Sequence, residues 1–128
     1  MKKVIAFFVV IYENRLVAMR RGPYVGLPQA VLSYTEEIST CAERAVGRCA
    51  ILRSLGRWVD LGGEDGEWDG EPVSFRIFFF PNAEAMIAPT HPDATLVDID
   101  ALSGEPDVSI HLLRRLGWRA PSQVALSA

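Results

Sequence analysis

Residues 27–52 read LPQAVLSYTEEISTCAERAVGRCAIL and contain the clearest periodic pattern in the chain. This pattern predicts an amphipathic helix over residues 36–49, because apolar side chains recur there at intervals of three and four. Ser33 and Thr35 are candidate N-caps of this helix, and Ser33 followed by Glu36 fits a capping box. The apolar face of the predicted helix is formed by Ile38, Cys41, Ala42, Ala45, Val46 and Cys49.

Apolar and β-branched runs on both sides of this helix predict strands. The first run, residues 3–12, is apolar almost throughout, which is typical of a central strand buried on both faces. The stretch 60–71 contains six acidic residues, and its glycine-rich part, residues 62–71, is predicted to be a loop. A second loop is predicted around residues 22–28, and a third over 81–94. The strands are expected at residues 3–12, 16–20, 57–61, 73–80 and 95–99.

A second helix is predicted over residues 107–116, because Asp107 can cap its first turn and Gly117 can end it. Strands around one central helix, with another helix at the end, indicate an α+β sandwich. The 128 residues are enough for one domain, which we expect to span residues 1–119. Residues 120–128 are expected to form a C-terminal tail.

Composition excludes several classes of function. The chain carries 13 Lys and Arg against 16 Asp and Glu, for a formal charge of −3, so it lacks the basic stripe that would bind nucleic acid. The apolar N-terminal run is far shorter than the roughly 20 residues of a membrane-spanning helix, so no membrane association is expected. Cys41 and Cys49 would lie roughly 12 Å apart along one helix, too far for a disulfide. We therefore expect a reducing, cytoplasmic setting.

The stretch 27–52 resembles the Nudix box, the signature of hydrolases that cleave a nucleoside diphosphate linked to another moiety. That box reads Gly, five residues, Glu, seven residues, then Arg-Glu-apolar-any-Glu-Glu-any-Gly-apolar. Glu36 and Arg44 have the separation of the Glu and Arg in this signature, which places Ala30 at the first Gly and Ile51 at the late Gly. Flanking segments resemble the family in the right order, so the likeness spans about residues 3–116. These segments are LVAMRR at 16–21, LP at 27–28 and TLVDIDAL at 95–102.

The resemblance implies a Nudix-like α/β/α sandwich with a mixed sheet, but the box is degenerate. In the family, Glu residues at the positions of Ala45, Arg48 and Cys49 hold divalent metals, whereas Glu36 and Arg44 mainly tie the loop to the helix. Mg²⁺ prefers hard oxygen ligands, and a methyl group, a guanidinium and a thiol supply none. We therefore expect a pseudoenzyme: a catalytically impaired or non-catalytic module that binds a nucleotide or another phosphate-bearing small molecule, or a partner. We expect no cofactor and a homodimer.

Two alternatives remain open at this stage. The first is an active pyrophosphohydrolase that uses Mg²⁺ or Mn²⁺ held by non-standard ligands from the acidic stretch 60–71, because loops often carry function. The second is a purely structural homodimer subunit. The candidate metal ligands of the first alternative are Glu64, Asp65, Glu67 and Asp69.

The candidate ligand-binding residues are basic and aromatic. Arg20, Arg21 and Arg48 can form a small phosphate-binding patch, because guanidinium groups bind phosphate through paired hydrogen bonds. Tyr24 and Trp68 are candidates for stacking on a nucleobase. Arg48 replaces a metal-binding Glu of the box, so we expect it to contact an anionic ligand directly.

Overall fold

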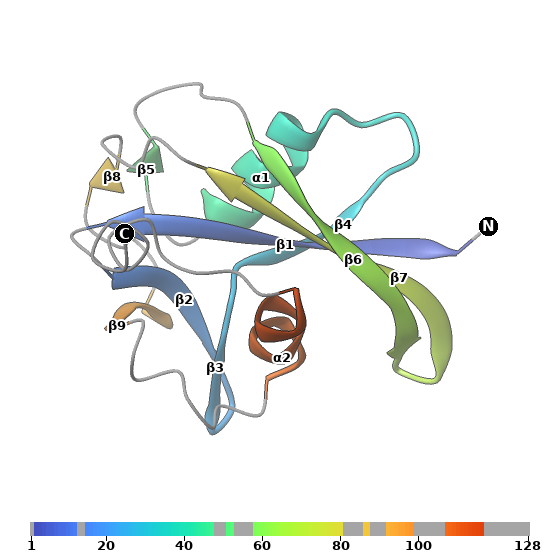
Figure 1. Ribbon diagram of the computed structural model, residues 1–128. Helices are drawn as coiled ribbons and strands as arrows, with labels where there is room; N and C mark the ends of the chain where they lie inside the picture. Colours follow the sequence, from blue (N-terminus) through green and yellow to red (C-terminus); the bar gives the residue numbers. More distant parts are fainter. Residues whose placement is uncertain are drawn as a thin grey trace, which may run out of the picture.

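The computed structural model describes residues 2–12, 15–47, 51–52, 58–80, 86–87, 92–98 and 107–116 (Figure 1). Two helices flank strands that are mostly joined into one mixed sheet. The elements in chain order are β1 (Lys3–Tyr12), β2 (Arg15–Arg21), β3 (Tyr24–Gly26), β4 (Gln29–Leu32), α1 (Ile38–Val46), β5 (Ile51–Leu52), β6 (Val59–Trp68), β7 (Glu71–Phe80), β8 (Met86–Ile87), β9 (Ala94–Asp98) and α2 (Val108–Arg115).

The predicted central strand is confirmed as β1, with the predicted bounds. Along one edge β1 pairs in parallel with β7, from Lys3 opposite Val73 to Val10 opposite Phe80. The other edge pairs antiparallel with two strands, β4 near its start and β2 at its end. The main path of the sheet is β3-β2-β1-β7-β6, with β9 beside β2 and with β5 and β8 forming a separate pair. The sheet is therefore mixed, as the resemblance implied.

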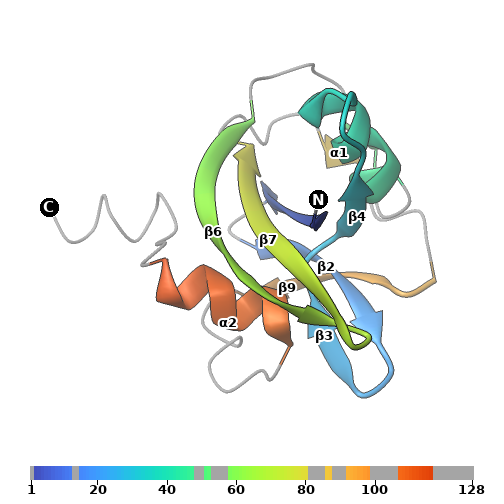
Figure 2. The same ribbon diagram turned by 90° about the vertical axis from the view of Figure 1, so that its right-hand side faces the viewer.

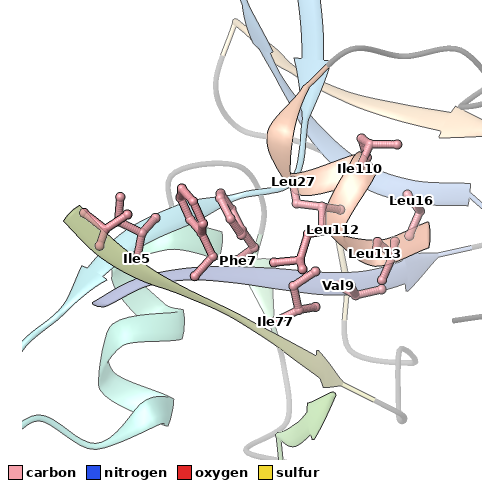
Figure 3. Packing of buried hydrophobic residues seen from close by; sticks show 11 residues of the cluster. Ile5, Phe7, Val9, Leu16, Leu27, Ile77, Ile110, Leu112 and Leu113 are labelled. Atoms are coloured by element: carbon pink, nitrogen blue, oxygen red, sulfur yellow. The ribbon is translucent and has the colours of Figure 1, made fainter. Parts of the chain in front are cut away.

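Alternate side chains of β1 enter two separate apolar cores, because successive residues of a strand point to opposite faces. Phe8 and its even-numbered neighbours pack with Phe78, Phe80 and the buried face of α1. Phe7 and its odd-numbered neighbours pack with Phe75, Ile77 and the buried face of α2. Figure 2 shows α1 and α2 on opposite sides of the strands, and Figure 3 shows the core on the α2 side. The α/β/α sandwich is confirmed.

The helix in residues 27–52 is shorter than the prediction of 36–49. α1 has Glu37 as its N-cap, with no hydrogen bond from that side chain to the helix, and Gly47 as its C-cap. The predicted capping box forms only in part: the Glu36 carboxylate accepts a hydrogen bond from the Ser33 backbone N–H at 3.2 Å, but in the turn before the helix. Neither Ser33 nor Thr35 is therefore the N-cap. Glu36 lies before the N-cap and pairs instead with Arg44 of α1.

The acidic stretch 60–71 is a β-hairpin, so the prediction of a loop over residues 62–71 was wrong. β6 continues to Trp68, and only Asp69 and Gly70 form the turn before β7. Their φ angles of 52° and 80° are those of a two-residue turn that matches the twist of the flanking strands. Alternation of apolar side chains is weak in β6 because it is an edge strand with three glycines, so the pattern gave no strand signal.

Other predicted loops also contain short strands. β3 lies within the predicted loop 22–28, β4 follows that loop directly, and β8 lies within the predicted loop 81–94. These strands have two to four residues, too few for a periodic pattern to emerge. Among the described residues, no helix is long and apolar enough to cross a membrane. The predicted tail 120–128 lies outside the described residues.

The C-terminal helix is confirmed. α2 begins after Asp107, whose carboxylate accepts a hydrogen bond from the Ser109 backbone N–H at 2.9 Å. This is the capping contact expected of an Asp at that position. Arg114 and Arg115 occupy the last turn, where positive charge interacts favourably with the helix dipole.

Candidate functional site

Glu36 and Arg44, whose separation resembles that of the Glu and Arg of the Nudix box, form an ion pair that joins the turn after β4 to α1. Arg44 Nε lies 3.1 Å from a Glu36 carboxylate oxygen, and Arg44 Nη2 also donates to that carboxylate. The same Nη2 donates to the Val31 carbonyl on β4 at 2.8 Å. The hydrogen bond that Arg44 donates to Glu36 raises the pKa of Arg44, which stays fully charged. The pair ties the turn before α1 to the helix.

Ala45, which the resemblance to the Nudix box aligns with the first metal-binding Glu, has a buried side chain. Only 4% of the residue is exposed. It belongs to the apolar cluster on the α1 side of the sheet, together with Cys41, Ala42 and Val46. A methyl group in such a cluster offers nothing to a divalent cation. The other two replaced positions, Arg48 and Cys49, lie outside the described residues.

Cys41 is a buried free thiol on α1. Its Sγ lies 3.8 Å from the Val31 carbonyl oxygen, near the Arg44 contact. Burial raises the pKa of Cys41 above its ordinary value of 9.0, and the negative charge of Glu36 acts in the same direction. Arg44 opposes both effects without cancelling them. Cys41 is therefore a protonated packing residue at neutral pH, because only the thiolate is a nucleophile.

The acidic residues of β6 point to opposite faces of the hairpin, and three of them have basic partners. Glu64 pairs with Arg115 of α2, with Arg115 Nε 3.2 Å from a carboxylate oxygen. Asp65 pairs with Lys2 at 2.9 Å, and Asp60 pairs with Arg76 of β7. Within the described part of the chain, no group of three or more His, Cys, Asp or Glu side chains is placed to hold a metal ion.

The other candidate residues of this hairpin are Glu67, Asp69 and Trp68. Glu67 is exposed near the end of β6, and Asp69 is in the turn. Trp68 is partly buried and packs edge-on against Phe75, with ring centroids 6.1 Å apart. The Trp68 ring is thus part of the border of the core on the α2 side.

The structure brings Arg21 and Tyr24 together at the end of the β2–β3 hairpin. They are directly opposite each other in the strand register, one pair beyond Arg20 and Val25. Tyr24 is 48% exposed. Arg20 is exposed as well, and its backbone N–H donates to the Asp93 carbonyl at 2.9 Å. Arg21 therefore lies beside one predicted stacking residue, whereas Arg20, its neighbour in β2, projects from the opposite face of the hairpin.

A polar network around Arg21 was not foreseen from the sequence. Arg21 Nη1 donates to the Asp107 carboxylate at 2.8 Å, and Nη2 donates to the Leu27 carbonyl. Ser109, which is fully buried, donates through its hydroxyl to Asp107 at 2.5 Å and accepts from the Leu27 backbone N–H at 3.0 Å. The network joins Leu27, which lies between β3 and β4, to the N-terminus of α2.

Gly26 has no side chain, and this leaves space for the network. A Cβ at Gly26 would collide with Arg21 Nη1 and with the Asp107 carboxylate. The ion pair therefore lies directly over the glycine, and a larger residue there would leave no space for it. The Arg21 and Asp107 contact spans 86 residues, which no local pattern can predict.

Comparison with known proteins identifies the fold. No family model and no curated protein sequence matches the chain. Among solved structures, it is similar to a MutT Nudix hydrolase from Burkholderia pseudomallei (18% identity, TM-score 0.58, 78% of this chain and 85% of the other). It is also similar to a Nudix hydrolase from Nitrosomonas europaea (15%, 0.63, 97% and 95%). A third similar chain comes from the complex between the C-terminal domain of mouse MUTYH and human PCNA (12%, 0.66, 91% and 88%). The fold is Nudix-like.

Proposed function

We propose that this chain is a Nudix-fold protein with a degenerate Nudix box, which binds a phosphate-bearing ligand and does not hydrolyse it at an enzymatic rate. The burial of Ala45 is the observation that carries this proposal. Divalent metals in this chemistry neutralise the charge of the diphosphate and activate water. A helix face that packs into an apolar core at this position has no oxygen ligand to offer them.

The contacts of the acidic hairpin support the same proposal. The hydrolase alternative needs carboxylates of β6 to converge on a metal. Glu64 and Asp65 instead point to opposite faces of the strand and pair with Arg115 and Lys2. Glu67 and Asp69 are exposed, and we place no metal there.

The proposed ligand is a nucleotide or a similar phosphate-bearing small molecule, without a cofactor. Arg20 and Arg21 are the proposed phosphate contacts, because guanidinium groups are suited to phosphate. Arg21 shares a face of the hairpin with Tyr24, and Arg20 projects from the other face. Tyr24, opposite Arg21, supplies an exposed ring on which a base can stack. From the sequence we add Arg48 as a further phosphate contact, and Trp68 with its partly exposed ring as a second stacking residue.

Two assays on the purified protein test this proposal. The first measures release of phosphate or nucleoside monophosphate from a panel of nucleoside diphosphate derivatives, with Mg²⁺ or Mn²⁺ and with EDTA. A MutT hydrolase is the positive control. We expect no metal-dependent turnover. Turnover at an ordinary enzymatic rate that EDTA abolishes would contradict the proposal and support the hydrolase alternative.

The second assay is calorimetric titration of the same panel in EDTA. We expect metal-independent binding of at least one nucleotide, and weaker binding by Arg20→Gln and Tyr24→Ala variants. Val59→Ala is the matched control, because Val59 is similarly exposed but lies on β6. Absence of binding at millimolar concentration for every member of the panel would contradict the binding function.

A partner-binding module is a second candidate. The similar chain found in the complex between the MUTYH C-terminal domain and PCNA supports it, because that structure is a protein–protein complex. We further propose that the chain is a homodimer. Light scattering coupled to size-exclusion chromatography measures the mass, which should be twice 14.1 kDa. A dimer that shows neither hydrolysis nor nucleotide binding would favour the structural-subunit alternative.

A further inference from the structure

We propose that Asp107 is an autoinhibitory contact: its carboxylate occupies the Arg21 guanidinium, and an anionic ligand must displace it to bind. This inference rests on the proposed function, because it concerns the same arginine. It adds a residue from α2, far along the chain, to a ligand site that the sequence placed near residues 20–24.

The geometry of the ion pair is the first support. Arg21 Nη1 lies 2.8 Å from Asp107 Oδ2, and the second terminal nitrogen of Arg21 donates to the Leu27 carbonyl. The two ends of the guanidinium that would hold a phosphate are thus both in use. The Asp107 side chain is 8% exposed and that of Arg21 is 24% exposed. A pair shielded in this way interacts more strongly than one in bulk water.

The network shows which partner can move. Without Arg21, the Asp107 carboxylate still accepts hydrogen bonds from the Ser109 backbone N–H and the Ser109 hydroxyl. The capping contact of α2 would therefore survive the exchange. Arg21 is the more exposed partner, so it is the group that can turn toward a ligand.

The surroundings of Arg21 indicate the class of ligand. Tyr24 is the cross-strand neighbour of Arg21, and paired residues project from the same face of a hairpin. A cationic group beside an exposed aromatic ring suits a molecule with both an anionic group and a planar ring, such as a nucleoside diphosphate. Such an anion would be repelled by the Asp107 carboxylate for as long as that carboxylate remains on Arg21.

The experiment compares the affinity of four full-length proteins for ADP and for inorganic pyrophosphate, by calorimetry in EDTA. Asp107→Asn removes the competing charge and keeps a good N-cap, so the variant should fold. Ser109→Ala is the matched control, because it perturbs the same network and leaves the Arg21–Asp107 pair in place. Arg21→Gln/Asp107→Asn tests whether any gain depends on Arg21.

We expect Asp107→Asn to bind both probes about tenfold more tightly than the wild type, which corresponds to one charge-assisted contact. Ser109→Ala should bind no more tightly than the wild type, and the double variant should lose the gain. A purely structural role of Asp107 would leave the affinity unchanged or lower it, and either result would overturn the inference.

The failure of this inference is distinguishable from that of the proposed function. Equal binding by the wild type and Asp107→Asn would overturn the autoinhibitory contact and leave nucleotide binding standing. No binding of either probe by any of the four proteins would overturn the inference, and the proposed function would fail only if the whole nucleotide panel also failed to bind. A gain for ADP without a gain for pyrophosphate would overturn the inference too, because displacement from Arg21 concerns the anionic group that both probes share.

Discussion

Arg44 of α1 contacts Glu36 across eight residues, with Arg44 Nε 3.1 Å from the carboxylate, and so fixes the turn between β4 and the helix. The same guanidinium donates to the Val31 carbonyl at 2.8 Å. One side chain therefore holds a strand end, a turn and a helix together. The contact needs the planar, forked geometry of Arg, since a carboxylate and a carbonyl are bound at the same time.

We expect Arg44→Lys to lose much of this restraint, because a single ammonium cannot reproduce the forked contact. Hydrogen exchange of the backbone amides of α1 measures the effect, which should appear as faster exchange across the helix. Glu43→Gln is the control, since Glu43 is an exposed residue of the same helix. Equal exchange rates in the two variants would show that the Arg44 contact contributes nothing to the helix.

Cys41 gives a prediction for pH dependence. Burial, and then the charge of Glu36, raise the pKa of Cys41 in the folded protein above its ordinary value of 9.0. Above that pH the unfolded chain loses the thiol proton while the folded chain keeps it, so the free energy of unfolding falls as pH rises. Below pH 9.0 both states keep the proton and the effect is absent.

The measurement is denaturant unfolding between neutral pH and pH 10.5 in a Cys49→Ser background. The wild-type Cys41 protein should lose stability above pH 9.0 more steeply than Cys41→Ala, whose position 41 does not titrate. Lys and Tyr titrations contribute equally to both proteins and cancel in the difference. Parallel pH profiles would mean that Cys41 is not shielded from solvent.

The helices and the central strand could be predicted because their signals are local. The apolar run of β1, the Asp107 cap of α2 and the three-and-four spacing of α1 each depend on residues close in sequence. The Glu36–Arg44 pair could be predicted from the resemblance, because its spacing is part of the signature. The start of α1 could not be, since the contact that Glu36 makes with Arg44 lies in the turn before the helix.

Contacts between segments that are far apart in the chain could not be predicted from local sequence patterns. The Arg21–Asp107 pair joins residues that are 86 positions apart, so the sequence alone does not indicate that Arg21 has a carboxylate partner. β6 was mistaken for a loop because an acidic, glycine-rich edge strand lacks apolar alternation. Its partner β7, apolar and aromatic, was easily recognised.

Gly26→Ala tests the space occupied by the Arg21–Asp107 pair. The added Cβ would collide with both partners. We expect a loss of about 1–3 kcal/mol in the free energy of unfolding, the usual cost of overpacking. In an Arg21→Ala/Asp107→Ala background the same substitution should cost much less, because both colliding side chains are then absent. An equal cost in both backgrounds would place the strain elsewhere.

Phe8 tests the core on the α1 side of the sheet. Its ring stacks on Phe78 at 5.8 Å and meets Trp58 edge-on at 5.1 Å. Phe8→Ala should lower the free energy of unfolding by about 3–5 kcal/mol. Val59→Ala, at a half-exposed position, should change it by less than about 0.5 kcal/mol. A cost for Phe8→Ala as small as that of the control would be incompatible with this packing.

Substitutions in the turn between β6 and β7 test whether Asp69 has a structural role or binds a metal. Gly70 has a φ of 80°, so Gly70→Ala should cost about 1–2 kcal/mol of unfolding free energy. Asp69 has a φ of 52°, and Asn suits this turn position equally well. Asp69→Asn should therefore leave the stability within about 0.5 kcal/mol of wild type, with or without Mn²⁺. If Asp69 instead held a metal, Mn²⁺ would raise the unfolding temperature of the wild type, and the Asn variant would lose that increase, because binding to the folded state stabilises it.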